Sequence, residues 1–340
     1  GSGGGAMRAQ REPAGAGVAD RGRSEEAACQ EKLDLTYGHT SEREYEPNVA
    51  APKPGARVHM RRDDDLEYQL FLPATWTPTG QDLYPVVVFL HGAGDGKFSV
   101  MNSQSLPRLL DSDQSTSFDP RRCWCLDKAY EQVLAKREAP ASVPEPFLQD
   151  DEALRSPLAD CGFAANFPAI TLMPQGWLPD KPTGWTHDLL EKVVRLTKKT
   201  LRTYRGDPTR VVLTGQSAGG AGVWGFLNLQ PRLWSAVSVV CAPSDLDDDL
   251  LRKVEGVPIW VVGWTGDGVS GNDDVVTQLK KRKSGAVRYT RYKEAPAPPD
   301  PLYRDMLNHA SYDLIYRDPR LWTWSFGQRN VAAQRLWADS

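Results

Sequence analysis

The sequence predicts an α/β protein built on a mostly parallel, doubly wound sheet with helices on both faces. Continuous apolar runs at residues 84–90, 167–173 and 210–213 are typical of strands that are buried on both sides. A pattern of helical period at 187–204 separates the second run from the third. Further strands are expected at 236–240 and 257–262, with a helix at 246–254 between them. Because β and α elements alternate, the functional sites of such a sheet are expected at the carboxyl ends of its strands.

The N-terminal region differs in composition from the rest of the chain. Residues 1–55 are rich in Gly, Ala, Arg, Glu and Pro without hydrophobic periodicity, which predicts a disordered tail, and residues 1–6 resemble a cloning remnant. A targeting segment that had been cut away would leave no trace, so a cytoplasmic location is only the default expectation. We expect one domain over residues 56–340, with an antiparallel edge strand at 66–72 and an inserted cap at 111–156.

The charge balance argues against nucleic-acid and membrane partners. The 340 residues include 41 basic and 44 acidic side chains, for a net charge of −3, and form no basic stripe. No apolar run reaches the roughly 18 residues of a membrane span. The five cysteines are an odd set without metal-ligand spacing, so no metal or cofactor is expected and a reduced compartment is the default. A bridge from Cys161 to Cys123 or Cys125 remains open for an exported protein.

A Gly-Gln-Ser-Ala-Gly sequence at 215–219 follows the apolar run at 210–213. A strand that turns abruptly into a helix strains its corner residue and projects that side chain clear of the sheet, and flanking glycines avoid Cβ collisions. The helix N-terminus that follows favours negative charge. The pentapeptide alone is common in plain turns, but at the carboxyl end of a buried strand it indicates that Ser217 is a nucleophile.

A serine hydroxyl needs a nearby base, and histidine is the usual one. Where a serine occupies a strand-to-helix turn of this kind, the chain order is serine, acid, histidine. Only His309 follows Ser217, so His309 is the expected base. Of the other histidines, His39 falls in the predicted tail and His59 at the start of the fold. His91 belongs to a glycine turn and His187 to the start of a helix.

The third catalytic group should be a carboxylate at a strand end between the serine and the histidine, where it holds the imidazole in one tautomer. Asp267 fits best, because it follows the strand predicted at 257–262 through a short turn. Three other carboxylates remain candidates for this role. Asp245 is the main competitor, and Asp273 and Asp274 are weaker ones.

An oxyanion hole needs two backbone N–H donors, one after the nucleophile and one in the loop after an earlier strand. Ala218 and Ala93 are the candidates, and Ala93 lies in the glycine-rich turn at 91–96. That turn lacks the pattern of a phosphate-binding loop and opens no obvious helix.

Substrate contacts are expected from side chains near the same strand ends. Tryptophan more often packs in a core, but three tryptophans on loops at one edge predict an apolar or aromatic acyl pocket. The candidates for substrate binding are Gln216, Trp177, Trp185 and Trp264.

Together these pieces resemble the α/β-hydrolase superfamily, and within it the phospholipase/carboxylesterase-like and feruloyl-esterase-like "predicted peptidase" branch. The matching segments are 89–94, 167–170, 173–175, 207–220 and 309–312. The resemblance implies the α/β-hydrolase fold, with Ser217, Asp267 and His309 as catalytic triad. This chain departs from its relatives in two places: Gly263-Trp264 stands where they usually carry His-Gly, and Asn308 where they usually carry Gly.

The expected function is that of a serine esterase, which cleaves a small-molecule carboxylic ester through an acyl-enzyme intermediate. One alternative is an acyltransferase that uses the same triad on an alcohol or amine acceptor. The other is a binding protein that keeps the fold without turnover. A peptidase is disfavoured, because no gating domain is visible in the sequence.

Overall fold

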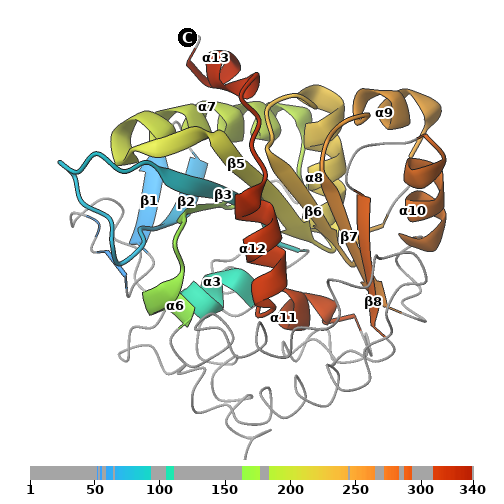
Figure 1. The fold of residues 1–340 in the computed structure, drawn as a ribbon, viewed down its shortest axis with the longest axis horizontal. Helices are drawn as coiled ribbons and strands as arrows, with labels where there is room; N and C mark the ends of the chain where they lie inside the picture. Colours follow the sequence, from blue (N-terminus) through green and yellow to red (C-terminus); the bar gives the residue numbers. More distant parts are fainter. Residues whose placement is uncertain are drawn as a thin grey trace, which may run out of the picture.

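The computed structural model describes residues 52, 54–55, 59–63, 66–92, 105–110, 163–176, 184–243, 246–264, 272–282, 287–292 and 309–338. Within these ranges eight strands form one sheet in the order β1-β2-β4-β3-β5-β6-β7-β8 (Figure 1). Pairing is parallel from β4 through β8, and antiparallel between β1 and β2 and between β2 and β4. The strands are β1 His59–Asp63, β2 Leu66–Phe71, β3 Tyr84–Leu90, β4 Ile170–Pro174, β5 Gly206–Gln216, β6 Ala236–Val240, β7 Ile259–Trp264 and β8 Val287–Tyr292. The prediction of a mostly parallel sheet is confirmed.

The strand expected at 66–72 is present as β2, but the prediction that it forms the edge of the sheet is wrong. β2 pairs with β1 on one side and with β4 on the other, so β1 is the outer strand. The sequence of β1, His-Met-Arg-Arg-Asp, carries no apolar alternation. Its strand conformation comes from backbone pairing with β2, which a hydropathy pattern does not register.

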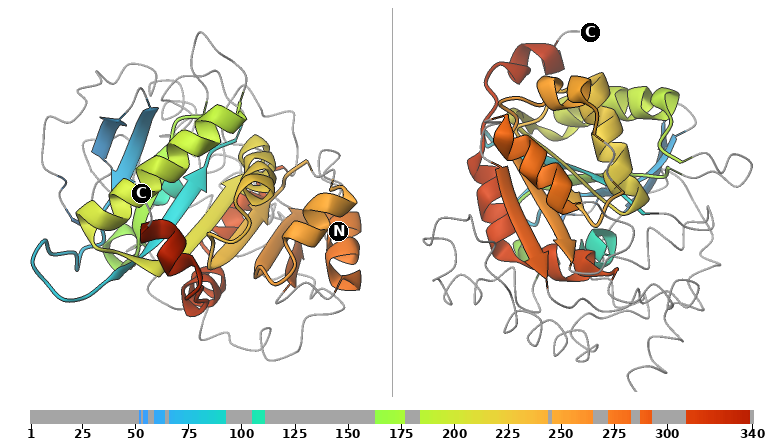
Figure 2. Two further views of the ribbon diagram at one scale, coloured as in Figure 1. Left: turned by 90° about the horizontal axis from the view of Figure 1, so that it is seen from above. Right: turned by 90° about the vertical axis from the view of Figure 1, so that its right-hand side faces the viewer.

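Helices cover both faces of the sheet (Figures 1 and 2). One layer contains α7, α8, α9 and α10, and the opposite layer contains α3, α6, α11 and α12. None of the helices in the described ranges combines the length and the hydropathy needed to cross a bilayer. The helices are α3 Ser105–Leu110, α6 Phe163–Asn166, α7 His187–Tyr204, α8 Ala218–Leu229, α9 Asp248–Lys253, α10 Asn272–Lys281, α11 Ser311–Ile315, α12 Pro319–Gly327 and α13 Ala333–Ala338.

Strand β3 shows why the sheet needs both layers. All seven of its residues are buried. Val86, Val88 and Leu90 belong to the core under α7 and α8, whereas Val87 and Phe89 belong to the core under α3, α11 and α12. Burying one such side chain contributes roughly 1.5–3 kcal/mol, so an apolar run without alternation is stable only as a central strand.

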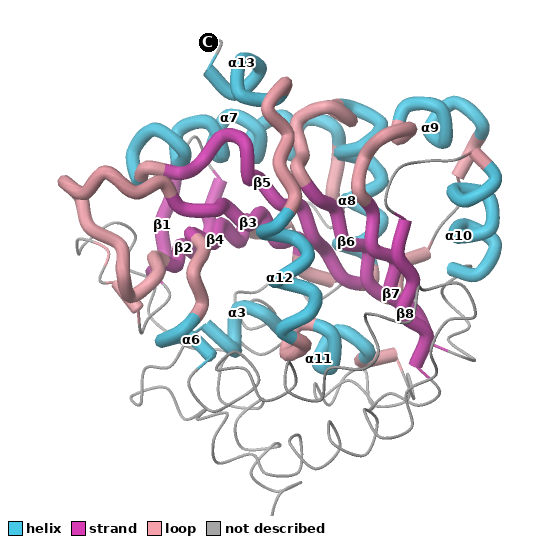
Figure 3. Tube along the Cα trace, in the orientation of Figure 1, coloured by secondary structure: helices cyan, strands magenta, loops and turns pink. Residues whose placement is uncertain are grey.

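The chain reverses its direction across the sheet at β3. β4 lies on one side of β3 and β5 on the other, as the trace in Figure 3 shows. In open α/β sheets the crevice at such a switch point, beyond the carboxyl ends of the strands, is where ligands bind. The residues that follow β3 and β5 therefore meet at the edge of the sheet where a site is expected.

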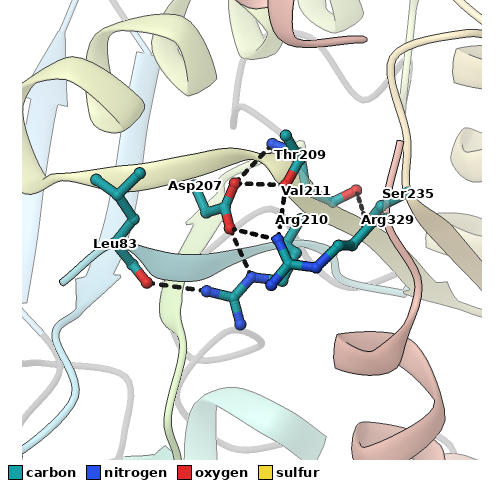
Figure 4. A network of polar contacts seen from close by, with 7 residues as sticks. All are labelled: Leu83, Asp207, Thr209, Arg210, Val211, Ser235 and Arg329. Carbon is teal, nitrogen blue, oxygen red and sulfur yellow. Dashed lines mark hydrogen bonds and ion pairs between the residues drawn. The ribbon is translucent and has the colours of Figure 1, made fainter. Parts of the chain in front are cut away.

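At the opposite end of β5, Asp207 joins the C-terminal segment to the sheet (Figure 4). Its carboxylate accepts hydrogen bonds from the Thr209 N–H at 2.9 Å, from the Thr209 hydroxyl at 2.7 Å and from Arg210 Nε at 2.7 Å. Arg329 Nη1 lies 3.3 Å from the same carboxylate. Burial opposes ionisation of Asp207, but the hydrogen bonds from Thr209 and Arg210 outweigh it and keep the pKa of the carboxyl below its usual value.

We expect Asp207→Asn to lower the free energy of unfolding by about 1–3 kcal/mol, because partly buried donors lose a charged acceptor. Asp249→Asn is the matched control: Asp249 also meets two cations, Arg252 and Lys253, but on the exposed surface of α9. Exposed ion pairs of this kind contribute little. Urea unfolding at pH 7 measures both variants, and equal effects would contradict a structural role for the Asp207 network.

Candidate active site

Ser217 occupies a strained corner between β5 and α8. Its backbone has φ 52° and ψ −122°, a conformation that a non-glycine residue rarely adopts. The Ser217 N–H donates to the carbonyl of Val240 at the end of β6, 2.9 Å away. Ser217 itself is half-buried, so its hydroxyl lies at the boundary between the sheet and solvent. This is the backbone geometry expected of a nucleophile at a strand-to-helix turn.

Two glycines make the corner possible by close approach. A Cβ atom on Gly215 would lie 2.4 Å from the carbonyl oxygen of Gly219. A Cβ atom on Gly219 would lie 2.1 Å from the carbonyl oxygen of Leu90 in β3. Any larger residue would force the first turn of α8 away from β3, and so move Ser217.

His309 lies against Ser217, although 92 positions separate the two in the chain. Its Nε2 is 3.0 Å from the Ser217 hydroxyl oxygen. The imidazole is buried, with 5% exposure, and packs edge-on to the ring of Tyr312 in α11. The Ser311 N–H donates to the carbonyl of His309 and begins α11 at that point. The structure therefore brings together the nucleophile and the base that the sequence predicts.

The predicted acid and part of the predicted oxyanion hole lie outside the described residues. These are Asp267, its main competitor Asp245, and Ala93. Of the weaker competitors, Asp273 accepts a hydrogen bond from the Tyr289 hydroxyl on β8, and Asp274 is exposed on α10. Ala218 is the first residue of α8, where backbone N–H groups lack partners within the helix.

The four candidates for substrate contact lie in different settings. The side chain of Gln216 is buried beside Ser217, and among the described residues its Oε1 has no hydrogen-bond partner. Trp185 is half-buried and packs edge-on to the ring of His91, with 5.2 Å between centroids. Trp177 lies outside the described residues, and Trp264 is described only as the last backbone position of β7. Substrate contact by these residues stays a prediction.

His91 has a larger part in the site than its place in a glycine turn indicates. It follows β3 and is 2% exposed. Its Nε2 accepts a hydrogen bond from the Gly176 N–H at 2.8 Å, so the ring proton is on Nδ1, which donates to the Gly92 carbonyl at 2.8 Å. Burial lowers the pKa of His91 to about 4, against the smaller opposing effect of the Gly92 bond. His91 is therefore neutral at pH 7.

Among the described residues, no three His, Cys, Asp or Glu side chains lie together in a way that could hold a metal ion.

The depressed pKa of His91 predicts a specific loss of stability in acid. The unfolded chain takes up this proton near pH 6.5, but the folded chain takes it up only near pH 4. The contribution of His91 to the free energy of unfolding is thus fully present above about pH 6.5, and it falls by about 3 kcal/mol towards pH 4. His91→Gln, which keeps an acceptor but does not titrate, should lose less stability over the same range.

Chemical denaturation at several pH values between 4 and 7 measures this difference. His187→Gln is the control, since His187 is exposed at the start of α7. If the His91→Gln and wild-type curves run parallel, His91 is not buried in its neutral form.

No protein-family model matches the sequence, and no curated protein matches it. Solved structures do: a thermostable esterase is 23% identical, with a TM-score of 0.50 over 81% of this chain. The chain spans 63% of that esterase.

Two further structures are more distant. A fluorophosphonate-binding serine hydrolase of Staphylococcus aureus is 12% identical over 81% of this chain and 100% of its own, with a TM-score of 0.48. A feruloyl esterase module of Clostridium thermocellum in complex with sinapinate is 11% identical, over 82% of this chain and 94% of its own, with a TM-score of 0.46. At these identities the likeness concerns the fold, and the chain has the α/β-hydrolase fold.

Proposed function

We propose that this protein is a serine hydrolase that cleaves carboxylic esters through an acyl-enzyme intermediate. The observation that carries the proposal is the 3.0 Å contact between the Ser217 hydroxyl and His309 Nε2 at a strained strand-to-helix corner. A nucleophile held within hydrogen-bond reach of a base is the arrangement that acyl transfer requires. A protein that only bound a ligand would have no need of a strained serine paired with a buried histidine.

In the proposed reaction, the Ser217 oxygen attacks the ester carbonyl carbon while the hydroxyl proton passes to His309 Nε2. The carbonyl electron pair moves onto oxygen, which we assign to the N–H groups of Ala218 and Ala93. The tetrahedral intermediate collapses as His309 protonates the departing alkoxide. Water then attacks the acyl-enzyme, with His309 as base, and the acid product leaves Ser217 free again.

The acid that orients His309 is assigned to Asp267. Since Nε2 of His309 faces Ser217, a carboxylate would have to bind the Nδ1 side of the ring. In the sequence Asp267 follows the end of β7. β7 pairs with β6, and β6 is the strand whose Val240 carbonyl accepts the Ser217 N–H. We assign an apolar or aromatic acyl group to the substrate on the sequence alone, in which Trp177 and Trp264 stand at or just after strand ends.

We expect Ser217→Ala to lower kcat by roughly 10⁴-fold or more and to abolish labelling by a fluorophosphonate probe, because the catalytic groups act as a unit. His309→Ala should cause a loss of similar order, whereas His187→Ala should leave kcat unchanged. Turnover of a p-nitrophenyl ester and the extent of probe labelling are the measurements. Substantial turnover in the Ser217→Ala variant would rule out Ser217 as the nucleophile.

The two acid candidates are separated by a pair of matched variants. Asp267→Asn should reduce kcat by roughly 10⁴-fold, the loss seen when the orienting carboxylate is replaced by its amide. Asp245→Asn should have a much smaller effect, since an aspartate outside the triad does not fix the imidazole tautomer. Steady-state kinetics on the two variants rank them, and the reverse ranking would move the acid to Asp245.

A further inference from the structure

The indole of Trp185 occupies a slot that exists because two neighbouring residues, Gly176 and Gly222, have no side chain. It precedes α7 and follows Gly184, whose φ is +70°. A Cβ atom on Gly176, just after β4, would come within 2.6 Å of Trp185 Cζ2 in the six-membered ring. A Cβ atom on Gly222 in α8 would come within 2.7 Å of Cγ in the five-membered ring. The indole therefore sits directly against the end of β4 and against the helix that begins at Ser217.

In this slot the indole N–H donates a hydrogen bond to the backbone that follows β3. Trp185 Nε1 donates to the carbonyl oxygen of His91 at 3.2 Å. The ring of Trp185 packs edge-on to the imidazole of His91. The same imidazole accepts the Gly176 N–H and donates to the Gly92 carbonyl. Trp185 and His91 thus bind each other, the end of β4 and the residues immediately after β3.

These contacts fix two consecutive peptide groups. The Trp185 bond holds the carbonyl of the His91–Gly92 peptide, and the His91 Nδ1 bond holds the carbonyl of the next peptide. A trans peptide is planar, so its carbonyl and its N–H point in opposite directions. Fixing the Gly92 carbonyl therefore fixes the plane of that peptide group. A Cβ atom on Gly92 would lie 3.3 Å from Ser217 Cβ, so this backbone passes directly beside the nucleophile.

We propose that Trp185 is a positioning residue for the oxyanion hole: acting through His91, it holds the backbone of Gly92, beside Ser217, in the orientation that oxyanion binding requires. The inference rests on the proposed function, and it differs from the role of pocket wall that the sequence indicates for Trp185. A pocket wall would contact the acyl group and change the KM of bulky esters. A positioning residue contributes in the transition state, where charge develops on the carbonyl oxygen, and so changes kcat.

Trp185→Phe tests the proposal, because it keeps an aromatic ring in the slot and removes the N–H donor. We expect kcat to fall about tenfold, less than the roughly 10²- to 10³-fold loss when an oxyanion donor is removed outright. KM should stay within about twofold for both an acetate and an aromatic ester. Affinity for an aryl trifluoromethyl ketone, which forms a tetrahedral adduct with a serine, should fall in proportion to kcat. Affinity for the acid product should not change.

Trp76→Phe is the matched control. Trp76 Nε1 donates to the carbonyl of Tyr204 at 2.8 Å, so this variant loses the same kind of bond at the far end of α7. It should lower thermal stability without changing kcat. Gly222→Ala is a second variant, in which the new methyl group displaces the indole while alanine favours the helix; its kcat and ketone affinity should fall together, as in Trp185→Phe.

Three results would overturn the proposal. The first is an equal loss of kcat in the Trp185→Phe and Trp76→Phe variants, which would indicate a general effect on stability. The second is a rise in KM confined to the aromatic ester with kcat unchanged, which would make Trp185 a pocket wall. The third is wild-type kinetics in both the Trp185→Phe and Gly222→Ala variants. Failure of the proposed function is distinguishable, since the wild-type protein would then show no turnover or labelling that depends on Ser217.

Discussion

The proposed active site depends on one strained backbone corner, at Ser217. A residue held in such a conformation costs about 1–3 kcal/mol, and it persists only where the surrounding structure over-determines it. Here the Ser217 N–H is bound to Val240 in the neighbouring strand, and Gly219 lies in contact with the end of β3. Both anchors come from central strands of the sheet, which are buried on both faces. The hydroxyl is thereby held at the edge of the sheet, where His309 meets it.

Much of the fold could be predicted from the sequence, because its central strands are apolar throughout. β3 and α7 occur where the runs at 84–90 and 187–204 indicate them. β8 could not be found in this way, since its sequence, Val-Arg-Tyr-Thr-Arg-Tyr, is not an apolar run. Its stability depends on tertiary contacts: the guanidinium of Arg288 lies 5.2 Å from the ring centroid of Trp260 and 5.3 Å from that of Trp324. No local pattern reveals that an arginine will lie beside the rings of two tryptophans from other elements.

The candidate site likewise contains some features that the sequence predicts and others that it does not. The pairing of Ser217 with His309 could be predicted, because a strand-to-helix turn and the order of residues along the chain carry that information. The role of His91 could not, because it depends on the Gly176 N–H, which lies just after β4 and 85 positions away in the chain. The setting of Trp185 depends likewise on the missing side chain at Gly222. In a sequence, an isolated glycine of this kind indicates a turn or a break in a helix. Only the structure shows that an aromatic ring occupies the space left by its missing side chain.

The most direct test of the central claim is to identify the covalent intermediate. The protein would be mixed with an excess of an aromatic p-nitrophenyl ester, quenched in acid within the first turnovers and digested for mass spectrometry. If Ser217 is the nucleophile, we expect a burst of p-nitrophenol that matches the enzyme concentration, and an added acyl mass on the peptide that contains Ser217. Steady turnover with no acylated peptide, or an acyl group on a different residue, would contradict it.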